Sequence, residues 1–105
     1  MTNYLLAYHG GGMPEGEEEQ ARVMAAWGSW YETLGQAIVD GGNPVGQSKT
    51  ISGDGSVTDG GGANPVSGYT IISADSLDMA TDLAKGCPIL EDGGSIEVGE
   101  IVSVM

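Results

Sequence analysis

The chain has 105 residues, with 15 acidic and three basic side chains and a formal net charge of -12. This length supports one domain, residues 1–105, with a single modest core. So much negative charge repels phosphate backbones and anionic lipid heads, so neither nucleic acid nor a membrane is an expected partner. No apolar run approaches the ~18 residues of a membrane-spanning helix. The lone Cys87 can form no disulfide within the chain, so we expect a cytoplasmic protein.

The amino-terminal part predicts one strand and one long helix. Residues Asn3–His9 are apolar and aromatic, which is typical of a strand. From Glu15 to Gly42 apolar side chains recur at the helical period, which predicts one amphipathic helix lying on a sheet. Glutamates at its start suit the helix dipole, and Gly41-Gly42 is expected to end it, because glycine adopts a left-handed backbone at least cost. The predicted apolar face comprises Met24, Trp27, Gly28, Tyr31, Leu34, Gly35 and Ile38, with Trp30 beside it.

The rest of the chain predicts short strands and a second helix. Asp54-Gly55 lies between two β-prone runs, which indicates a β-hairpin. Apolar residues spaced by three and four follow Ser76, so we expect a helix capped by Asp75 or Ser76 and ended by Gly86 and Pro88. The predicted elements are strands at Val45–Ile51, Val57–Thr58, Tyr69–Ser73 and Ile96–Val104, and the helix at Ser76–Lys85.

The order of these elements predicts an α+β fold. A strand, a long helix, two hairpin strands or strand pieces, a short helix and a strand make the split β-α-β unit of the ferredoxin-like fold, with an antiparallel sheet and both helices on one face. The strands carry bulky side chains on both faces, for example Leu5 beside Tyr4 and Leu6. A second apolar face requires a cover, so we expect a homodimer that packs sheet to sheet as a dimeric α+β barrel.

Several short motifs, in this order, resemble the YCII-related family. They are Tyr4-Leu5-Leu6-Ala7-Tyr8-His9-Gly10, Val57-Thr58-Asp59-Gly60, Gly68-Tyr69 and Cys87-Pro88. The resemblance covers nearly the whole chain, and the branch named after an Asp-Gly-Pro-Phe (DGPF) motif is the most similar. It implies a ferredoxin-like protomer that pairs as a dimeric α+β barrel. Two features depart from the family: Gly61-Gly62 follows Asp59-Gly60, and Trp27 stands where a helix histidine, paired with an aspartate, is the family's proposed catalytic group.

His9 and Asp59 are the candidate catalytic residues. His9 is the only histidine, and its unperturbed pKa lies near neutrality. If the loops that carry these two side chains meet, they could form an acid–base pair. A solvated loop histidine and a turn-forming aspartate are the alternative interpretation. Cys87 has no cationic neighbour in the sequence, so we interpret it as a buried, unreactive thiol.

Tyrosine and tryptophan are the chain's only aromatic residues, since it contains no phenylalanine. Their polar tips suit either internal hydrogen bonds or the lining of a small-molecule pocket. The pocket candidates are Tyr8, Trp27, Trp30, Tyr31 and Tyr69.

Two functions follow from these features. The first is a dimeric module that binds a small molecule or a protein. The second is a cofactor-independent enzyme of lyase or isomerase type, in which His9 transfers a proton together with Asp59 or a tyrosine. Neither function calls for a cofactor or a metal site, because one histidine and one cysteine make no usual zinc set.

Overall fold

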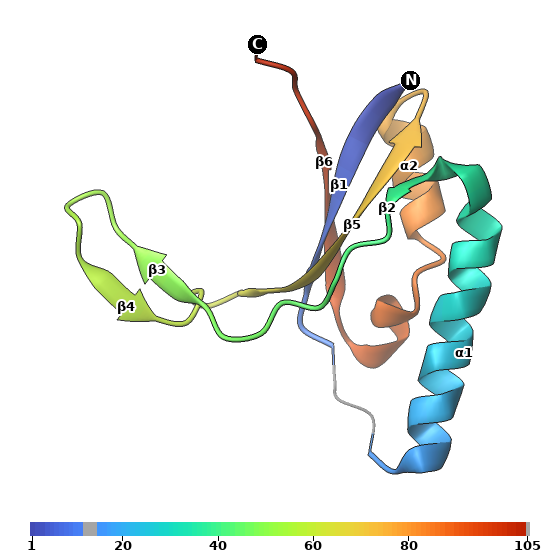
Figure 1. The fold of residues 1–105 in the computed structure, drawn as a ribbon, viewed down its shortest axis with the longest axis horizontal. Coiled ribbons are helices and arrows are strands. Elements are labelled where there is room, and N and C mark those ends of the chain that lie inside the picture. Colours follow the sequence, from blue (N-terminus) through green and yellow to red (C-terminus); the bar gives the residue numbers. More distant parts are fainter. Residues whose placement is uncertain (12–14, 105) are drawn as a thin grey trace.

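A computed structural model describes residues 1–11 and 15–104, so the predicted loop at Gly10–Gly12 is described only as far as Gly11. A four-stranded antiparallel sheet in the order β2-β5-β1-β6 carries both helices on one face (Figure 1). This is the predicted ferredoxin-like split β-α-β unit. Its elements are β1 (Thr2–His9), α1 (Glu17–Leu34), a 3-10 turn (Gly35–Ala37), β2 (Ile38–Asp40), β3 (Lys49–Ile51), β4 (Val57–Asp59), β5 (Val66–Ala74), α2 (Leu77–Ala84), a second 3-10 turn (Pro88–Asp92) and β6 (Ser95–Glu100).

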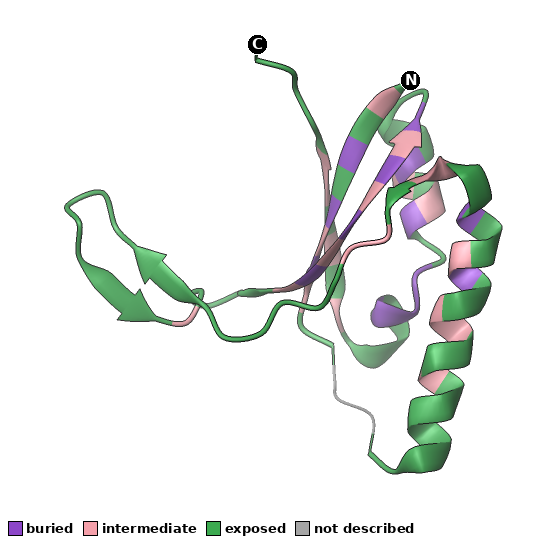
Figure 2. Ribbon diagram, in the orientation of Figure 1, coloured by how far each residue is buried: buried purple, intermediate pink, exposed green. Residues whose placement is uncertain are grey.

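The core lies between the sheet and the two helices. Side chains alternate along β1 and β5, and those that face the helices are buried, because successive strand residues point to opposite faces (Figure 2). The buried residues of the sheet are Tyr4, Leu6, Tyr8, Thr70, Ile72 and Ala74, and those of the helices are Trp30, Leu34, Ala80 and Ala84. The core is therefore one cluster on one side of the sheet.

The predicted helix from Glu15 to Gly42 is wrong at its carboxyl end. Helix α1 ends at Leu34, and its cap is Gly35 with φ of 53° rather than Gly41 or Gly42. Residues Ile38–Asp40 form the edge strand β2 against β5. The helical spacing of Ile38 is a coincidence of sequence, because its backbone takes extended dihedrals once the chain has left the helix at Gly35.

Other boundaries also differ from the sequence prediction. The second strand is confined to Lys49–Ile51, and β5 begins at Val66, three residues before the predicted start. The last strand ends at Glu100 rather than at Val104, and Val102 and Val104 are exposed. Helix α2 matches its prediction closely, since Ser76 is the N-cap and its side chain accepts a hydrogen bond from the Met79 N–H at 3.1 Å.

The predicted hairpin forms a separate two-stranded sheet, β3 with β4, and the Ser52 N–H donates to the Ser56 carbonyl across the turn. We call residues 45–61 the arm. It extends away from the four-stranded sheet, and its strand residues are all exposed (Figures 1 and 2). The radius of gyration is 15.1 Å, against about 13 Å for a compact chain of this length. Among the described residues, no helix is long and apolar enough to span a membrane.

Candidate functional site

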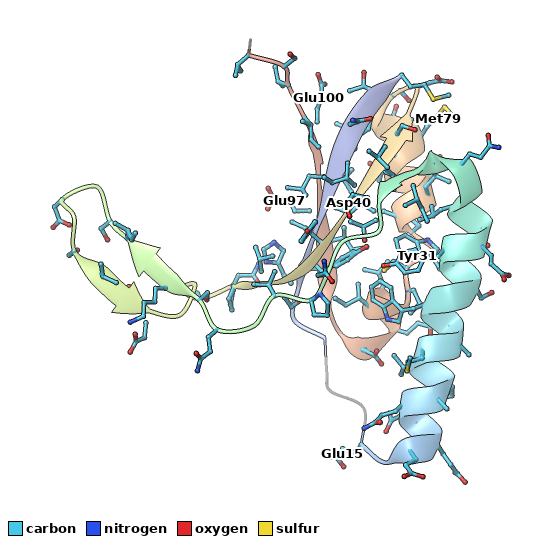
Figure 3. All side chains as sticks on the ribbon, in the orientation of Figure 1. Glu15, Tyr31, Asp40, Met79, Glu97 and Glu100 are labelled. Carbon is cyan, nitrogen blue, oxygen red and sulfur yellow. The ribbon has the colours of Figure 1, made fainter. Side chains whose placement is uncertain are left out.

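Three aromatic side chains share one face of α1, and two of them, Trp27 and Tyr31, line the candidate site. Trp27, Trp30 and Tyr31 are spaced by three and four residues, so they share one face of the helix. The ring centroids of Trp27 lie 5.7 Å from those of Trp30 and 6.0 Å from those of Tyr31. Tyr8 of β1 meets Trp27 edge to face at 5.4 Å, which is a favoured geometry for aromatic pairs. Tyr31 reaches from α1 toward the sheet (Figure 3).

Trp30 belongs to the core rather than to the site. It is 5% exposed, and its Nε1–H donates a hydrogen bond to the Leu83 carbonyl at 3.0 Å. Gly86 leaves room for the indole, because a Cβ there would lie 3.1 Å from Trp30 Cδ1. Trp30 therefore holds α1 against the end of α2.

A partly enclosed pocket of about 360 Å³ opens between Trp27 and Tyr31 of α1, strand β5 and the segment that follows β2. This volume is at the small end of the range for ligand pockets, roughly 300 to 1,000 Å³. Four of the five predicted pocket residues line it, and Trp30 does not. No charged side chain is among the lining residues, which are Tyr8, Trp27, Tyr31, Gly42, Asn43, Pro44, Ser67, Gly68, Tyr69 and Ile89.

Two of the pocket tyrosines donate their hydroxyl protons within the protein. The Tyr8 hydroxyl donates to Thr70 Oγ1 at 2.7 Å, and Thr70 Oγ1 donates to the Gly41 carbonyl at 3.1 Å. The Tyr31 hydroxyl donates to the same carbonyl, also at 3.1 Å. Burial raises the pKa of Tyr8 well above its ordinary value, so this phenol remains neutral in any physiological medium.

Ser67 is a pocket residue that the sequence analysis did not identify. Tyr8 pairs with Gly68 and His9 pairs with Val66, so Ser67 is the extra residue of a β-bulge in β5. Bulges redirect a side chain and are frequent beside functional sites. Ser67 Oγ is buried and has no hydrogen-bond partner among the described residues. An unsatisfied buried hydroxyl costs about 1–3 kcal/mol, which makes this oxygen an exception that calls for an explanation.

The structure gives His9 and Asp59 separate partners. His9 Nδ1 lies 3.0 Å from the Asn64 carbonyl oxygen, and its Nε2 lies 3.8 Å from a carboxylate oxygen of Glu97. Asp59 Oδ1 lies 3.3 Å from Lys49 Nζ at the base of the arm. No hydrogen bond or ion pair joins His9 to Asp59 in the described part of the chain, and neither residue lines the pocket. Their acid–base pairing stays a prediction without a direct contact in this structure.

Cys87 and the acidic side chains supply no further reactive group. The Cys87 side chain is buried beside Tyr8, and burial raises the pKa of its thiol to about 11, so the nucleophilic thiolate is scarce near neutrality. Over residues 1–11 and 15–104, no three His, Cys, Asp or Glu side chains gather closely enough to hold a metal ion. What the site offers chemically is an apolar, ring-lined space whose polar side chains include the buried Ser67 hydroxyl, the Tyr69 hydroxyl and the Asn43 amide.

The fold and pocket define a ferredoxin-like α+β domain with a space of small-ligand size. The chain belongs to the YCII-related domain family, whose model matches residues 3–104. Among solved structures, 5-chloro-2-hydroxyhydroquinone dehydrochlorinase from Burkholderia phenoliruptrix AC1100, in complex with 2,5-dihydroxybenzoquinone, has a similar fold. The TM-score is 0.56 at 18% sequence identity, over 95% of this chain and 93% of that chain. A comparison with curated protein sequences finds no match.

Proposed function

We propose that this YCII-related domain binds a small aromatic molecule in the pocket beside α1. The observation that carries the proposal is the lining: aromatic rings from β1, α1 and β5 surround a space of about 360 Å³ that contains no charged side chain. Apolar, ring-lined pockets with few polar groups are typical of small-molecule sites. A cavity of roughly 150 Å³ already holds benzene, so a substituted single ring fits here.

The Burkholderia dehydrochlorinase supports the choice of a single-ring compound as the test ligand. That enzyme is in complex with a single six-membered ring, 2,5-dihydroxybenzoquinone. At 18% identity that likeness extends to the fold alone, and its reaction does not transfer to this chain. A lyase or isomerase activity stays the alternative prediction. Binding is the better-supported function, because His9 and Asp59 lie outside the pocket and have separate partners.

The binding proposal predicts that p-cresol, a neutral single ring, occupies the pocket. We expect a dissociation constant of about 1 mM or lower by isothermal titration calorimetry. Trp27→Ala should weaken binding about tenfold, because it removes a ring of the wall and its stacking energy. Met24→Ala is the matched control, since Met24 lies on the same helix and is 74% exposed. Wild-type protein that binds no p-cresol, or equal losses in both variants, would contradict the proposal.

We propose that the protein functions as a homodimer that packs through the open face of the sheet. Leu5 is 38% exposed on that face, opposite Ile71 in register, and neither helix covers this side (Figure 1). The arm requires a partner surface as well, because an isolated two-stranded hairpin is only marginally stable in water. Its apolar residues Ile51 and Val57 are 73% and 55% exposed. A second copy of the chain can cover both.

Light scattering tests the dimer. The wild type at micromolar concentration should have twice the chain mass of 10.7 kDa. Leu5→Lys places a charge at the proposed interface and should weaken the dimer by about 2 kcal/mol or more. Met24→Lys makes the same charge change on exposed helix surface and should leave the mass unchanged. In hydrogen exchange, the amides of the arm should lose protection in Leu5→Lys alone. A monomeric wild type would refute the dimer.

The cytoplasmic location stays a prediction. It is supported by the single, buried, free Cys87, which a reducing compartment suits.

A further inference from the structure

We propose that the ligand of the pocket is an uncharged aromatic molecule with a hydrogen-bonding substituent, and that Ser67 is the residue that binds this substituent. The inference rests on the proposed binding function and specifies its ligand class and its specificity-determining residue.

The lining excludes an anion. No lysine, arginine or histidine lines the pocket, so a carboxylate or phenolate would enter an apolar space without a counter-charge, which is strongly unfavourable. The net charge of -12 adds a repulsive field on the approach. A hydroxyquinone such as 2,5-dihydroxybenzoquinone is a vinylogous acid and ionises readily. This pocket should therefore prefer neutral phenols to that compound.

The lining also disfavours a cation. A quaternary ammonium or amine ligand requires free ring faces, and commonly a carboxylate nearby. Here the rings pack against one another: Trp27 stands edge to face with Tyr8 at 78° and with Trp30 at 81°. No aspartate or glutamate lines the pocket. An uncharged ligand is the class that remains.

Two hydroxyls that line the pocket, those of Ser67 and Tyr69, make no hydrogen bond among the described residues, and Ser67 carries the buried one, which gains most from a ligand partner. The Tyr8, Tyr31 and Thr70 hydroxyl protons are donated to Thr70 Oγ1 and the Gly41 carbonyl. Ser67 Oγ, by contrast, is buried without a partner among the described residues, on a bulge that belongs to the pocket wall. A serine hydroxyl both donates and accepts, and it turns about a single bond to meet its partner. A hydroxyl or carbonyl group on the ring would satisfy it.

Four probes of one shape separate the parts of this inference: p-cresol, toluene, p-toluate and 4-methylbenzylammonium. In titrations of the wild-type protein, p-cresol should bind best. The dissociation constants of the two ions, p-toluate and 4-methylbenzylammonium, should be at least about tenfold higher. Ser67→Ala should weaken p-cresol binding about five- to tenfold, the loss typical of one neutral hydrogen bond. It should change toluene binding by less than about twofold, because toluene makes no such bond.

Two further readouts distinguish binding from packing. Ser67→Ala removes an unsatisfied buried hydroxyl, so the ligand-free variant should melt at the same temperature as the wild type or higher. Ser73→Ala, on the same strand but outside the pocket lining, is the control and should bind all four probes as the wild type does.

Each contrary result identifies what has failed. If either ion binds as tightly as p-cresol, the ligand is not restricted to uncharged molecules. If Ser67→Ala leaves p-cresol binding unchanged, or weakens toluene and p-cresol binding equally, Ser67 does not bind the substituent of the ligand. In that case the proposed binding function still holds as long as Trp27→Ala weakens p-cresol binding. If the wild type binds none of the probes, the proposed function fails and this inference with it.

Discussion

Gly42→Ala is expected to destabilise the protein by about 3 kcal/mol or more, because the new methyl group has no space and the positive φ is unfavourable for a residue with a Cβ. A Cβ at Gly42 would lie 1.6 Å from the Tyr69 carbonyl oxygen, and the residue has φ of 75°. The segment after β2 lies directly against β5 here, where the Tyr69 N–H donates to the Asn43 carbonyl at 3.3 Å. A side chain would push apart two walls of the pocket.

Gly41→Ala is the matched control for this prediction. Gly41 is the preceding residue, has no positive φ, and would place its Cβ with nothing within 4 Å. Its carbonyl, which accepts from Tyr31 and Thr70, is retained. Urea unfolding at one fixed protein concentration should therefore show a change within about 0.5 kcal/mol for Gly41→Ala. If both variants unfold at the same urea concentration, the close approach of Gly42 to β5 does not exist in solution.

Trp30→Ala should also destabilise the fold by about 3–5 kcal/mol, since it leaves a large cavity between the two helices. It removes the hydrogen bond to the Leu83 carbonyl and the contact with Gly86 at the end of α2. Trp30→Phe keeps a ring and loses the N–H donor, so it should lower the free energy of unfolding less than Trp30→Ala does.

Thermal and urea unfolding measure these losses, with Met24→Ala on the same helix as the control that should change little. A Trp30→Ala protein as stable as wild type would contradict the assignment of Trp30 to the core. Trp27→Ala is the complementary variant, because Trp27 is half-buried at the pocket wall and its loss should lower ligand affinity more than stability.

The site was only partly visible in the sequence. Tyr8, Trp27, Tyr31 and Tyr69 were predicted from their amphipathic rings, and all four line the pocket. Ser67 was missed because its role depends on a bulge, and a bulge is a mismatch in register between two strands, not a pattern within one of them. The Ser67-Gly68 pair was the one available signal, and it is typical of any loop.

The elements whose residue pattern is local could be predicted from the sequence alone. The run of apolar and aromatic residues predicted β1, alternation predicted β6, spacing of three and four predicted α2 with Asp75 or Ser76 as its cap, and Asp54-Gly55 predicted the hairpin. The order of the predicted elements led to the split β-α-β fold, although β2 was predicted as part of the helix and the hairpin strands lie outside the four-stranded sheet. Each of these segments contains, in its own residues, the dihedral preferences and the single apolar face that define the element.

The end of α1 and the position of the hairpin outside the main sheet depend on contacts in the folded protein. Residues Ile38–Asp40 continue the helical spacing of apolar residues, yet they pair with β5 at the edge of the sheet. This pairing satisfies their backbone N–H and C=O groups, and the spacing of apolar residues carries no information about such a partner. The arm forms a sheet of its own, the bulge in β5 places Ser67 in the pocket wall, and the His9 side chain lies near Glu97 rather than Asp59. Each of these outcomes depends on contacts between segments far apart in the chain, which no local pattern encodes.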